Sequence, residues 1–264
     1  MSTRQFIAGQ STSNQPSILT SHFVEFGPAE LLARFFLRAE HEARSQGVHL
    51  SFANCADMVA ANELNKINWL PLLPLFNPKF AALNPENSFC ILGRNGNGDV
   101  VSANAGRLYE WHQTDIVEEA QSLRLYYDDA NRMKLPNESC TVTARLALQV
   151  SGRVAYVGAA WVHPNFRGRG LSETLPRIAK ALAFTKWKPN WITSLMTEST
   201  HSKGLAEKFA YNHADWEVLW RNGPLGDLRC AILWMDMPHL VSDLDQYLVR
   251  CESQVETRFL AGRA

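Results

Sequence analysis

Apolar residues recur along the chain at two spacings, which predict where helices and strands lie. Residues 28–46 have a helical spacing, with Pro28 at the start and Gly47 just past the end. A second amphipathic helix is predicted over residues 170–186. Its apolar face holds Leu171, Leu175, Ile178, Ala179, Leu182 and Ala183. Both helices therefore present one face to a core.

The rest of the pattern mixes short strands with further helices. Two hairpins are predicted: residues 89–93 with 100–109, and residues 141–150 with 153–162 around a turn at Ser151 and Gly152. Strands are also predicted over 48–52, 191–196, 216–220 and 230–237, the last two as an antiparallel pair. Helices are predicted over 56–69, 114–134, 202–213 and 240–259. Because helices and strands alternate without an internal repeat, the sequence indicates one α+β (three-layer α/β) domain.

Residues 28–238 are interpreted as this single domain, followed by a C-terminal helix in residues 239–264. Residues 1–27 form a polar leader, and Met1 to Ser21 lacks the apolar core of a secretory signal, so we expect a cytoplasmic protein. No apolar stretch approaches the roughly 20 residues that span a bilayer, so no membrane partner is expected.

Charge and side-chain chemistry exclude several classes of function. The 26 basic and 26 acidic residues leave a net charge of zero, so no overall field attracts nucleic acid or an anionic membrane. Any bound anion must be held locally. The five cysteines are odd in number and widely spaced, which favours buried reduced thiols. The eight histidines lack metal-ligand spacing, so no metal is expected.

One junction carries candidate chemistry: the predicted strand 153–162 runs through residues 163–172 into the predicted helix 170–186. Gly168 and Gly170 let the backbone adopt positive φ and approach a ligand. The first amides of a helix have no internal partner and lie at the positive end of its dipole. Arg167 and Arg169 add two local cations. The pattern predicts a pyrophosphate site.

Two other interpretations apply to the glycines of this junction. The junction could be a plain strand-to-helix turn that contains two glycines and two exposed arginines. A hydrolase nucleophile built on Gly170, Leu171 and Ser172 is excluded, because Thr174 stands where the motif requires glycine. The glycines at 93, 96 and 98 are explained by the first hairpin turn, since no helix follows them.

The junction resembles a known family. Val162 and Pro164, then Arg167, Gly170 and Ser172, are similar to the V-x-P and R-x-x-G-x-[GA] signature of the GNAT superfamily of N-acetyltransferases, whose loop amides hold the pyrophosphate of acetyl coenzyme A. Residues 154–237 follow the family well and residues 48–150 follow it loosely, with 114–134 as an insertion. Two departures are Ser172, where the family has Gly or Ala, and Pro176 in the helix.

The resemblance implies a mostly antiparallel twisted sheet flanked by helices, with an N-terminal extension and a C-terminal helix. It also implies acetyl coenzyme A or another acyl coenzyme A as co-substrate. Its pantetheine arm would lie along the small residues Gly158 to Ala160, with a backbone amide near Ala160 to Val162 polarising the thioester. The implied cofactor-binding residues are Ala160, Trp161, Val162, Arg167, Gly168, Arg169, Gly170, Leu171 and Ser172.

Acetyl transfer to an amine also needs a base and an acid. Tyr156 fills the position of the family's strand glutamate, so Glu198, after the strand 191–196, is the first candidate base and Glu110 the second. Tyr211, beside the expected position of the sulfur, is the candidate general acid. The alternative for Tyr211 is an aromatic side chain that only packs the helix.

The predicted function is therefore acyl transfer from coenzyme A to an amine by direct transfer in a ternary complex. The acceptor, a small molecule or a protein amine, stays open; late tryptophans such as Trp216, Trp220 and Trp234 leave an aromatic acceptor among the options. The resemblance also allows a homodimer. The alternative is a non-catalytic acyl-coenzyme A regulator or scaffold. It is favoured by Ser172, by Gly204 at a position where the family often has Asn, and by the missing strand carboxylate.

Overall fold

An eight-stranded sheet organises the chain in the computed structural model, which describes residues 24–261 and the side chains of the last helix as far as Ser253. The strand order is β1-β2-β3-β5-β6-β8-β7-β4, and every neighbouring pair is antiparallel except β5 with β6. The strands are β1 (His49–Ala53), β2 (Ser88–Arg94), β3 (Val100–Asp115), β4 (Ser139–Val142), β5 (Ser151–Val162), β6 (Trp191–Thr197), β7 (His213–Gly223) and β8 (Gly226–Asp236). This mixed, mostly antiparallel sheet flanked by helices is the predicted α+β class.

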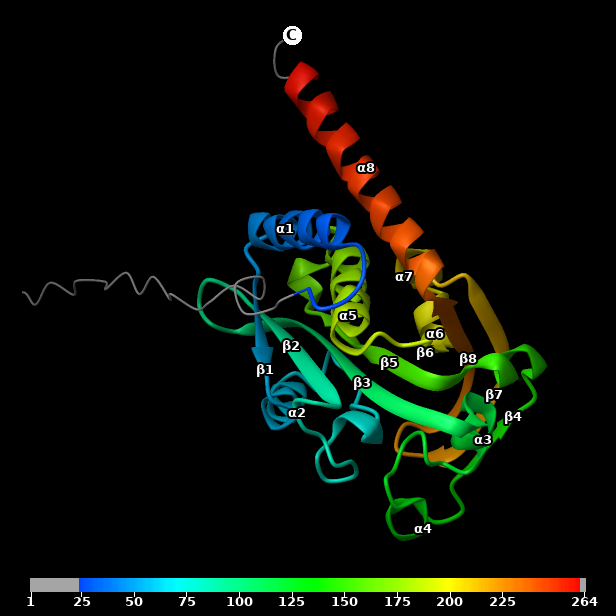
Figure 1. Ribbon diagram of the computed structural model, residues 1–264. Helices are drawn as coiled ribbons and strands as arrows, with labels where there is room; N and C mark the ends of the chain where they lie inside the picture. Colours follow the sequence, from blue (N-terminus) through cyan, green and yellow to red (C-terminus); the bar gives the residue numbers. More distant parts are fainter. Residues whose placement is uncertain (1–23, 262–264) are drawn as a thin grey trace, which may run out of the picture.

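Helices cover both faces of the sheet (Figure 1). They are α1 (Ala29–Ser45), α2 (Cys55–Leu64), α3 (Ile116–Gln121), α4 (Ala130–Met133), α5 (Leu171–Trp187), α6 (Glu198–His201), α7 (Leu205–Phe209) and α8 (Met237–Ala261). α1, α5 and the first half of α8 pack on one face, while α2, residues 69–83 and α3 cover the other. α8 then extends away from the body, as Figure 1 shows.

The alternation of side chains along β5 explains why the sheet has a core on each face. Ala155 and Val157 point toward α5, whereas Val154 and Tyr156 point toward the opposite layer. A central strand buried on both faces reads as a continuous apolar run. The run of small and apolar residues in the sequence therefore marks the middle of the sheet.

Helix α5 is the best-predicted element. It begins at Leu171 and ends at Trp187, so the expected helix over 170–186 is confirmed. It passes through Pro176 without interruption, although proline removes one backbone hydrogen bond there. The predicted helix over 28–46, the first hairpin, the strand 191–196 and the antiparallel pair at the end of the sheet are also confirmed. The predicted C-terminal helix over 240–259 lies within α8.

The predicted helix over 114–134 is wrong. β3 runs through Asp115, whose carboxylate accepts hydrogen bonds from the amides of Val117 and Glu118 and starts the six-residue α3. Leu123 then adopts a φ of 64°, which ends any continuous helix. Tyr126 and Tyr127 are buried beyond it, and only the short α4 follows.

The predicted hairpin around Ser151 and Gly152 is also wrong. β5 pairs with β3, with Gly152 opposite Trp111. Of residues 141–150, only Thr141 and Val142 belong to a strand, β4, which pairs with β7 at the far edge of the sheet. A 3-10 helix, Arg145–Gln149, occupies most of the rest.

The predicted helix over 202–213 is divided as well. Gly204 adopts a φ of 67° between α6 and α7, and Ala210 a φ of 50° after α7, so each helix is short. The polar leader lies almost entirely outside the described residues. All five cysteines are buried and free, as expected. Within the described part of the chain, no helix combines the length and apolarity needed to cross a bilayer.

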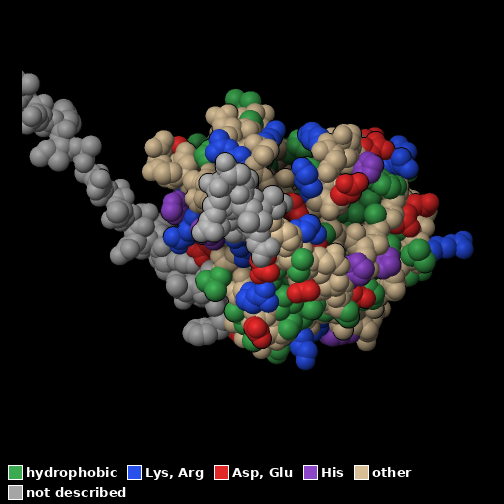
Figure 2. All heavy atoms as spheres, turned by 90° about the horizontal axis from the view of Figure 1, so that it is seen from above, with side chains coloured by type: hydrophobic (Ala, Val, Ile, Leu, Met, Phe, Trp, Pro, Cys, Tyr) green, Lys and Arg blue, Asp and Glu red, His purple; other side chains and the backbone are tan. Residues whose placement is uncertain are grey.

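Basic and acidic side chains are intermingled on the face seen in Figure 2. This distribution agrees with the balance of 26 basic and 26 acidic residues. The fields of opposite charges that alternate over short distances cancel at longer range, and salt screens what is left beyond about 10 Å. Recognition of a charged ligand therefore depends on local geometry.

Candidate functional site

The loop between β5 and α5 is built by a sequence of local hydrogen bonds. The amide of His163 still donates to the carbonyl of Val101 at 2.8 Å, which ties the end of β5 to β3. A 3-10 turn, Pro164–Phe166, follows, and the His163 side chain accepts from the Asn165 amide at 3.2 Å. Gly168 and Gly170 then adopt φ values of 75° and 83°. These left-handed conformations favour glycine and turn the chain into α5.

The backbone amides that follow this turn are available to a ligand. Within residues 24–261, the amides of Gly168, Arg169, Gly170, Leu171 and Ser172 donate no hydrogen bond, and no side chain caps α5. Nothing lies within 4 Å of a Cβ built at Gly168 or Gly170, so this side of the loop is open. We call residues 168–172 the amide cradle. Free amides at a helix N-terminus form an anion site.

The two arginines of the loop are exposed, and each is anchored to the loop itself. Arg167 Nε donates to the carbonyl of Val162 at 3.0 Å. Arg169 donates to the carbonyl of Asn165 at 2.8 Å, and its guanidinium lies 4.8 Å from the ring centre of Phe166. These contacts hold two positive charges beside the amide cradle. An anion bound there would meet both backbone dipoles and full charges.

The sheet opens next to the amide cradle. β5 and β6 are paired only through Val154 to Tyr156, opposite Trp191 to Thr193. Beyond these residues β6 pairs with β8 alone, while β5 continues to Val162 beside β3. Among the described residues, the backbone of β5 from 157 to 162 has no strand partner on the β6 side. We call this segment the unpaired edge of β5.

A bulge shapes the unpaired edge. The register of β5 against β3 shifts between Gly158 and Trp161, and Ala159 adopts a φ of 54°. Bulges of this kind bend a strand and redirect its backbone groups. Ala160 is exposed although β5 is a central strand. Exposed backbone in mid-sheet can accept an extended ligand as a further strand-like partner.

An aromatic stack anchors Trp161, a residue of the unpaired edge, in the core. Trp161 stacks on Trp69 with ring centres 4.6 Å apart, and its indole N–H donates to the carbonyl of Asn68 at 3.0 Å. Trp161 is therefore fixed in the core, and of its groups only the backbone faces the unpaired edge. The predicted contribution of Ala160, Trp161 and Val162 to ligand binding depends on backbone groups.

Tyr156 is the residue that the sequence resemblance places at the position of the strand glutamate. It is fully buried, and its hydroxyl accepts a hydrogen bond from the amide of Leu195 at 3.1 Å. The phenol thus links β5 to β6 just beyond the last backbone pair. Burial raises the pKa of Tyr156, so it remains a neutral phenol.

Tyr211, the candidate general acid, lies between α7 and β7 and contacts Ser194 on β6. Ser194 follows the last residue of β6 that pairs with β5, so Tyr211 borders the opening of the sheet. Burial raises the pKa of Tyr211, partly offset by its hydrogen bond with Ser194. A phenol that stays protonated at neutral pH has the form that a proton donor needs.

The two candidate bases lie in different places. Glu198 begins α6 directly after β6, where it forms an exposed ion pair with Arg229 at 3.0 Å. Glu110 pairs with Arg153 near the start of β5. The amide cradle follows the end of β5 at Val162, ~30 Å further along the extended strand. Glu198 therefore lies on the β6 side of the opening, whereas Glu110 lies beside the opposite end of β5.

A buried charged cluster, which no pattern in the sequence predicts, lies beside the site. Arg177 on α5 is 3% exposed and binds Asp243 of α8 at 2.7 Å. It also donates to the carbonyl of Lys208 in α7 at 3.1 Å. One turn along α5, fully buried Lys180 donates to the carbonyl of Phe209 at 2.6 Å and lies 4.8 Å from the ring centre of Tyr211. We call Arg177, Lys180 and Asp243 the α5–α8 cluster.

Burial lowers the pKa of Lys180 to about 7, with Asp243 acting in the opposite direction. The unfolded chain keeps this proton up to about pH 10, so between these values the unfolded state binds more protons than the folded state. The effect of Lys180 on the free energy of unfolding should therefore be a rise between about pH 7 and about pH 10. Below about pH 7 the charged, buried Lys180 destabilises the folded state by its full amount. Lys180→Met should flatten that rise and increase stability at about pH 6 relative to wild type. Urea unfolding across this pH range measures both effects.

The matched control for this prediction is Lys186→Met. Lys186 lies on the same helix and is half-exposed, so its removal should leave the pH profile parallel to that of wild type. Equal profiles for wild type and Lys180→Met would contradict the assigned effect of burial.

Comparison with known proteins finds no protein-family model that matches the chain and no similar curated protein. Among solved structures, the chain is similar to mutant forms of the spermidine/spermine N-acetyltransferase SpeG from Vibrio cholerae, with 10% identity and a TM-score of 0.44, over 75% of this chain and 98% of that one. It is also similar to the aminoglycoside acetyltransferase AAC(6')-Ib in complex with coenzyme A and kanamycin, with 14% identity and a TM-score of 0.40, over 73% of this chain and 96% of that one.

Proposed function

We propose that the protein is an acyltransferase that moves an acetyl or other acyl group from coenzyme A to an amine. The observation that carries the proposal is the amide cradle: five consecutive amides, from Gly168 to Ser172, without a partner among the described residues at the head of α5. Exposed amides at a helix N-terminus are satisfied by a capping side chain, by water or by a ligand, and no described side chain caps α5. Their position beside the unpaired edge of β5 suits a ligand with a diphosphate and an extended arm.

The residues present fit coenzyme A in two respects. The amide cradle would hold the pyrophosphate, with Arg167 and Arg169 as flanking cations. The backbone of the unpaired edge, at Gly158 to Ala160, would accept the amide groups of the pantetheine arm in the manner of an added strand. When bound, the thioester supplies the activated acyl group.

The chain's own groups then have distinct tasks. A backbone amide near Ala160 to Val162 would polarise the thioester carbonyl, which is an electrostatic contribution made without reorganisation. Glu198 is the first candidate to take a proton from the acceptor amine, which at neutral pH is almost entirely protonated. Tyr211 would donate a proton to the departing thiolate. Holding the two reactants in one complex lowers the activation barrier further. In well-aligned intramolecular reactions this contribution reaches about 7–11 kcal/mol.

Tyr211→Phe is the variant that tests catalysis. It removes the phenolic proton and keeps the ring that packs against Lys180, so folding and coenzyme A affinity should persist. We expect turnover to fall about 100-fold or more, since general acid catalysis contributes at least this factor. The assay is release of free thiol from acetyl coenzyme A with a panel of amines, including polyamines, aryl amines and peptides. Calorimetry of acetyl coenzyme A binding is the control for folding and affinity.

The alternative function is a non-catalytic acyl-coenzyme A regulator or scaffold. Its supporting observation is Tyr156, which stands at the position of the strand carboxylate and whose hydroxyl is already bound to the Leu195 amide. A regulator would bind acetyl coenzyme A and release no thiol with any amine in the panel. Turnover that disappears in Tyr211→Phe would exclude it. A homodimer and a cytoplasmic location remain predictions.

A further inference from the structure

Two cysteines lie in contact on the other side of the sheet from α5. Cys90 is in β2, directly opposite Ala53 of β1. Two residues after Ala53, Cys55 begins α2, where the Asn54 side chain accepts from the amide of Asp57 and caps the helix. The Sγ atoms of Cys55 and Cys90 are 2.9 Å apart. The turn between β1 and α2 therefore places the Cys55 thiol against Cys90 of the neighbouring strand β2.

The two thiols differ in access. Cys55 lines a cavity of about 600 Å³ between the end of β1, the segment 78–89 and α5. Cys90 is fully buried behind it, with an exposed fraction of 0% against 8% for Cys55. A small reagent in the cavity would meet the sulfur of Cys55 first. The sulfur of Cys90 is placed to react only with Cys55.

The electrostatic surroundings also favour Cys55 over Cys90 as the reactive thiol. Cys55 is the first residue of the ten-residue α2, at the positive end of the helix dipole. A hydrogen bond from the Cys90 thiol lowers the pKa of Cys55 against the effect of burial, with help from Ser88 and the charge of Arg107. The pKa of Cys90 is raised by the same contact and by its burial. Cys55 is thus the nucleophile of the pair.

We propose that Cys55 and Cys90 form a redox-active dithiol that a hydroperoxide entering the 600 Å³ cavity converts to a disulfide. In the first step the Cys55 thiolate attacks one peroxide oxygen, the O–O bond breaks, and the leaving oxygen takes up a proton as water or alcohol. In the second step the Cys90 sulfur attacks the Cys55 sulfenic acid and expels its oxygen as water. Two thiols lose two electrons and two protons, and the peroxide gains both.

The disulfide would fix α2 to β2. α2 continues into residues 65–69, where Trp69 stacks on Trp161 of β5. Cys90, Ala105 and Gly158 also lie in one row across β2, β3 and β5. The dithiol is therefore joined through packed elements to the strand that borders the amide cradle, although its chemistry is independent of the proposed acyl transfer.

The test is treatment of the folded full-length protein with hydrogen peroxide, followed by maleimide labelling and non-reducing peptide mapping. We expect the number of alkylatable thiols after denaturation to fall from five to three, with one disulfide that joins Cys55 to Cys90. Cys90→Ser should leave a sulfenic acid on Cys55 that dimedone traps. Cys55→Ser should leave Cys90 reduced, because the remaining thiol is buried.

Cys140→Ser is the matched control. Cys140 is also buried, but its sulfur contacts the Tyr126 hydroxyl at 3.7 Å rather than a thiol, so this variant should form the same disulfide as wild type. A circular dichroism melt of each variant checks folding. Five intact thiols in treated wild type, or a disulfide between any other two cysteines, would overturn the proposal.

Discussion

Gly170→Asp should weaken binding of acetyl coenzyme A by about 100-fold or more, equivalent to ~2.7 kcal/mol. A Cβ at Gly170 points into open space, so the new carboxylate would lie in front of the free amides of the amide cradle. It would accept their hydrogen bonds and repel a diphosphate, and charge-assisted hydrogen bonds of this kind contribute ~1.5–3 kcal/mol each. Isothermal calorimetry with acetyl coenzyme A measures the change.

Gly98→Asp is the matched control for this variant. Gly98 lies in the turn between β2 and β3 with a φ of 86°, and a Cβ there also meets nothing within 4 Å. The backbone strain of the substitution is therefore the same as at Gly170, where φ is 83°. Gly98→Asp should bind like wild type. Wild-type affinity in Gly170→Asp would refute the amide cradle as the diphosphate site.

Asp243→Ala should reduce the free energy of unfolding by about 3 kcal/mol, the lower end of the range for removing one partner of a buried ion pair. Arg177 is almost fully buried, and Asp243 is the carboxylate nearest to its guanidinium, at 2.7 Å. The more distant Glu173 at 3.4 Å and two backbone carbonyls would offset only part of the loss. Urea denaturation followed by circular dichroism measures the change.

Two further variants separate the buried pair from other effects of α8. Asp245 lies on the same helix and is exposed, so Asp245→Ala should change stability by no more than about 0.5 kcal/mol. The double variant Arg177→Met with Asp243→Leu should recover most of the loss, because it removes the buried guanidinium together with its carboxylate partner, while Lys180 keeps its bond to the Phe209 carbonyl. A single variant Asp243→Ala as stable as Asp245→Ala would show that water reaches Arg177.

The sequence predicted the strand, loop and helix of the candidate site because their signals are local. The apolar face of α5 repeats over four turns, and glycine is the residue that tolerates the positive φ found at positions 168 and 170. The same locality explains the correct prediction of α1 and of the hairpin between β2 and β3. These elements are determined by residues close to one another in the chain.

Predictions that depended on distant partners were less successful. Residues 114–134 have a helical spacing of apolar positions, but Tyr126 is buried by stacking on Trp220 with ring centres 4.1 Å apart, almost a hundred positions away. The strand after residue 138 pairs with β7 rather than with its sequence neighbour β5. Glu110 follows the first predicted hairpin in the sequence, and only the register with Arg153 shows at which end of β5 it lies.

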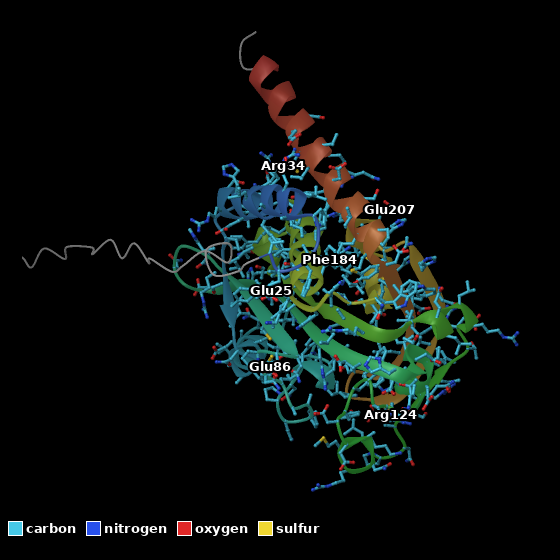
Figure 3. The ribbon with its side chains drawn as sticks, viewed as in Figure 1. Glu25, Arg34, Glu86, Arg124, Phe184 and Glu207 are labelled. Atoms are coloured by element: carbon cyan, nitrogen blue, oxygen red, sulfur yellow. The ribbon has the colours of Figure 1, made fainter. Side chains whose placement is uncertain are left out.

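The α5–α8 cluster was invisible for a related reason. Arg177 and Lys180 lie outside the apolar stripe of α5, a position that predicts a solvent-exposed face. α8 covers that face, as Tyr247 shows by bonding to Thr174 at 2.9 Å. Arg34, labelled in Figure 3, extends from α1 to Glu252 of α8 and adds an exposed ion pair at 2.8 Å. The contact between Cys55 and Cys90 likewise required the register of β1 and β2.

The short pairing between β5 and β6 divides the sheet into two blocks. β1, β2, β3 and β5 form one block and β6, β8, β7 and β4 the other, and among the described residues the blocks pair as strands only where Val154 to Tyr156 lie opposite Trp191 to Thr193. α5 packs on the first block, whereas α7 precedes β7 and α8 follows β8 in the chain, and the α5–α8 cluster connects these helices. The spacing of the two blocks beside the unpaired edge is consequently held by side chains, by the α5–α8 cluster on one face and by the Tyr156 hydroxyl on the other. Changes in helix packing therefore offer a route to adjust how wide a molecule fits between the blocks, without altering any residue that touches it.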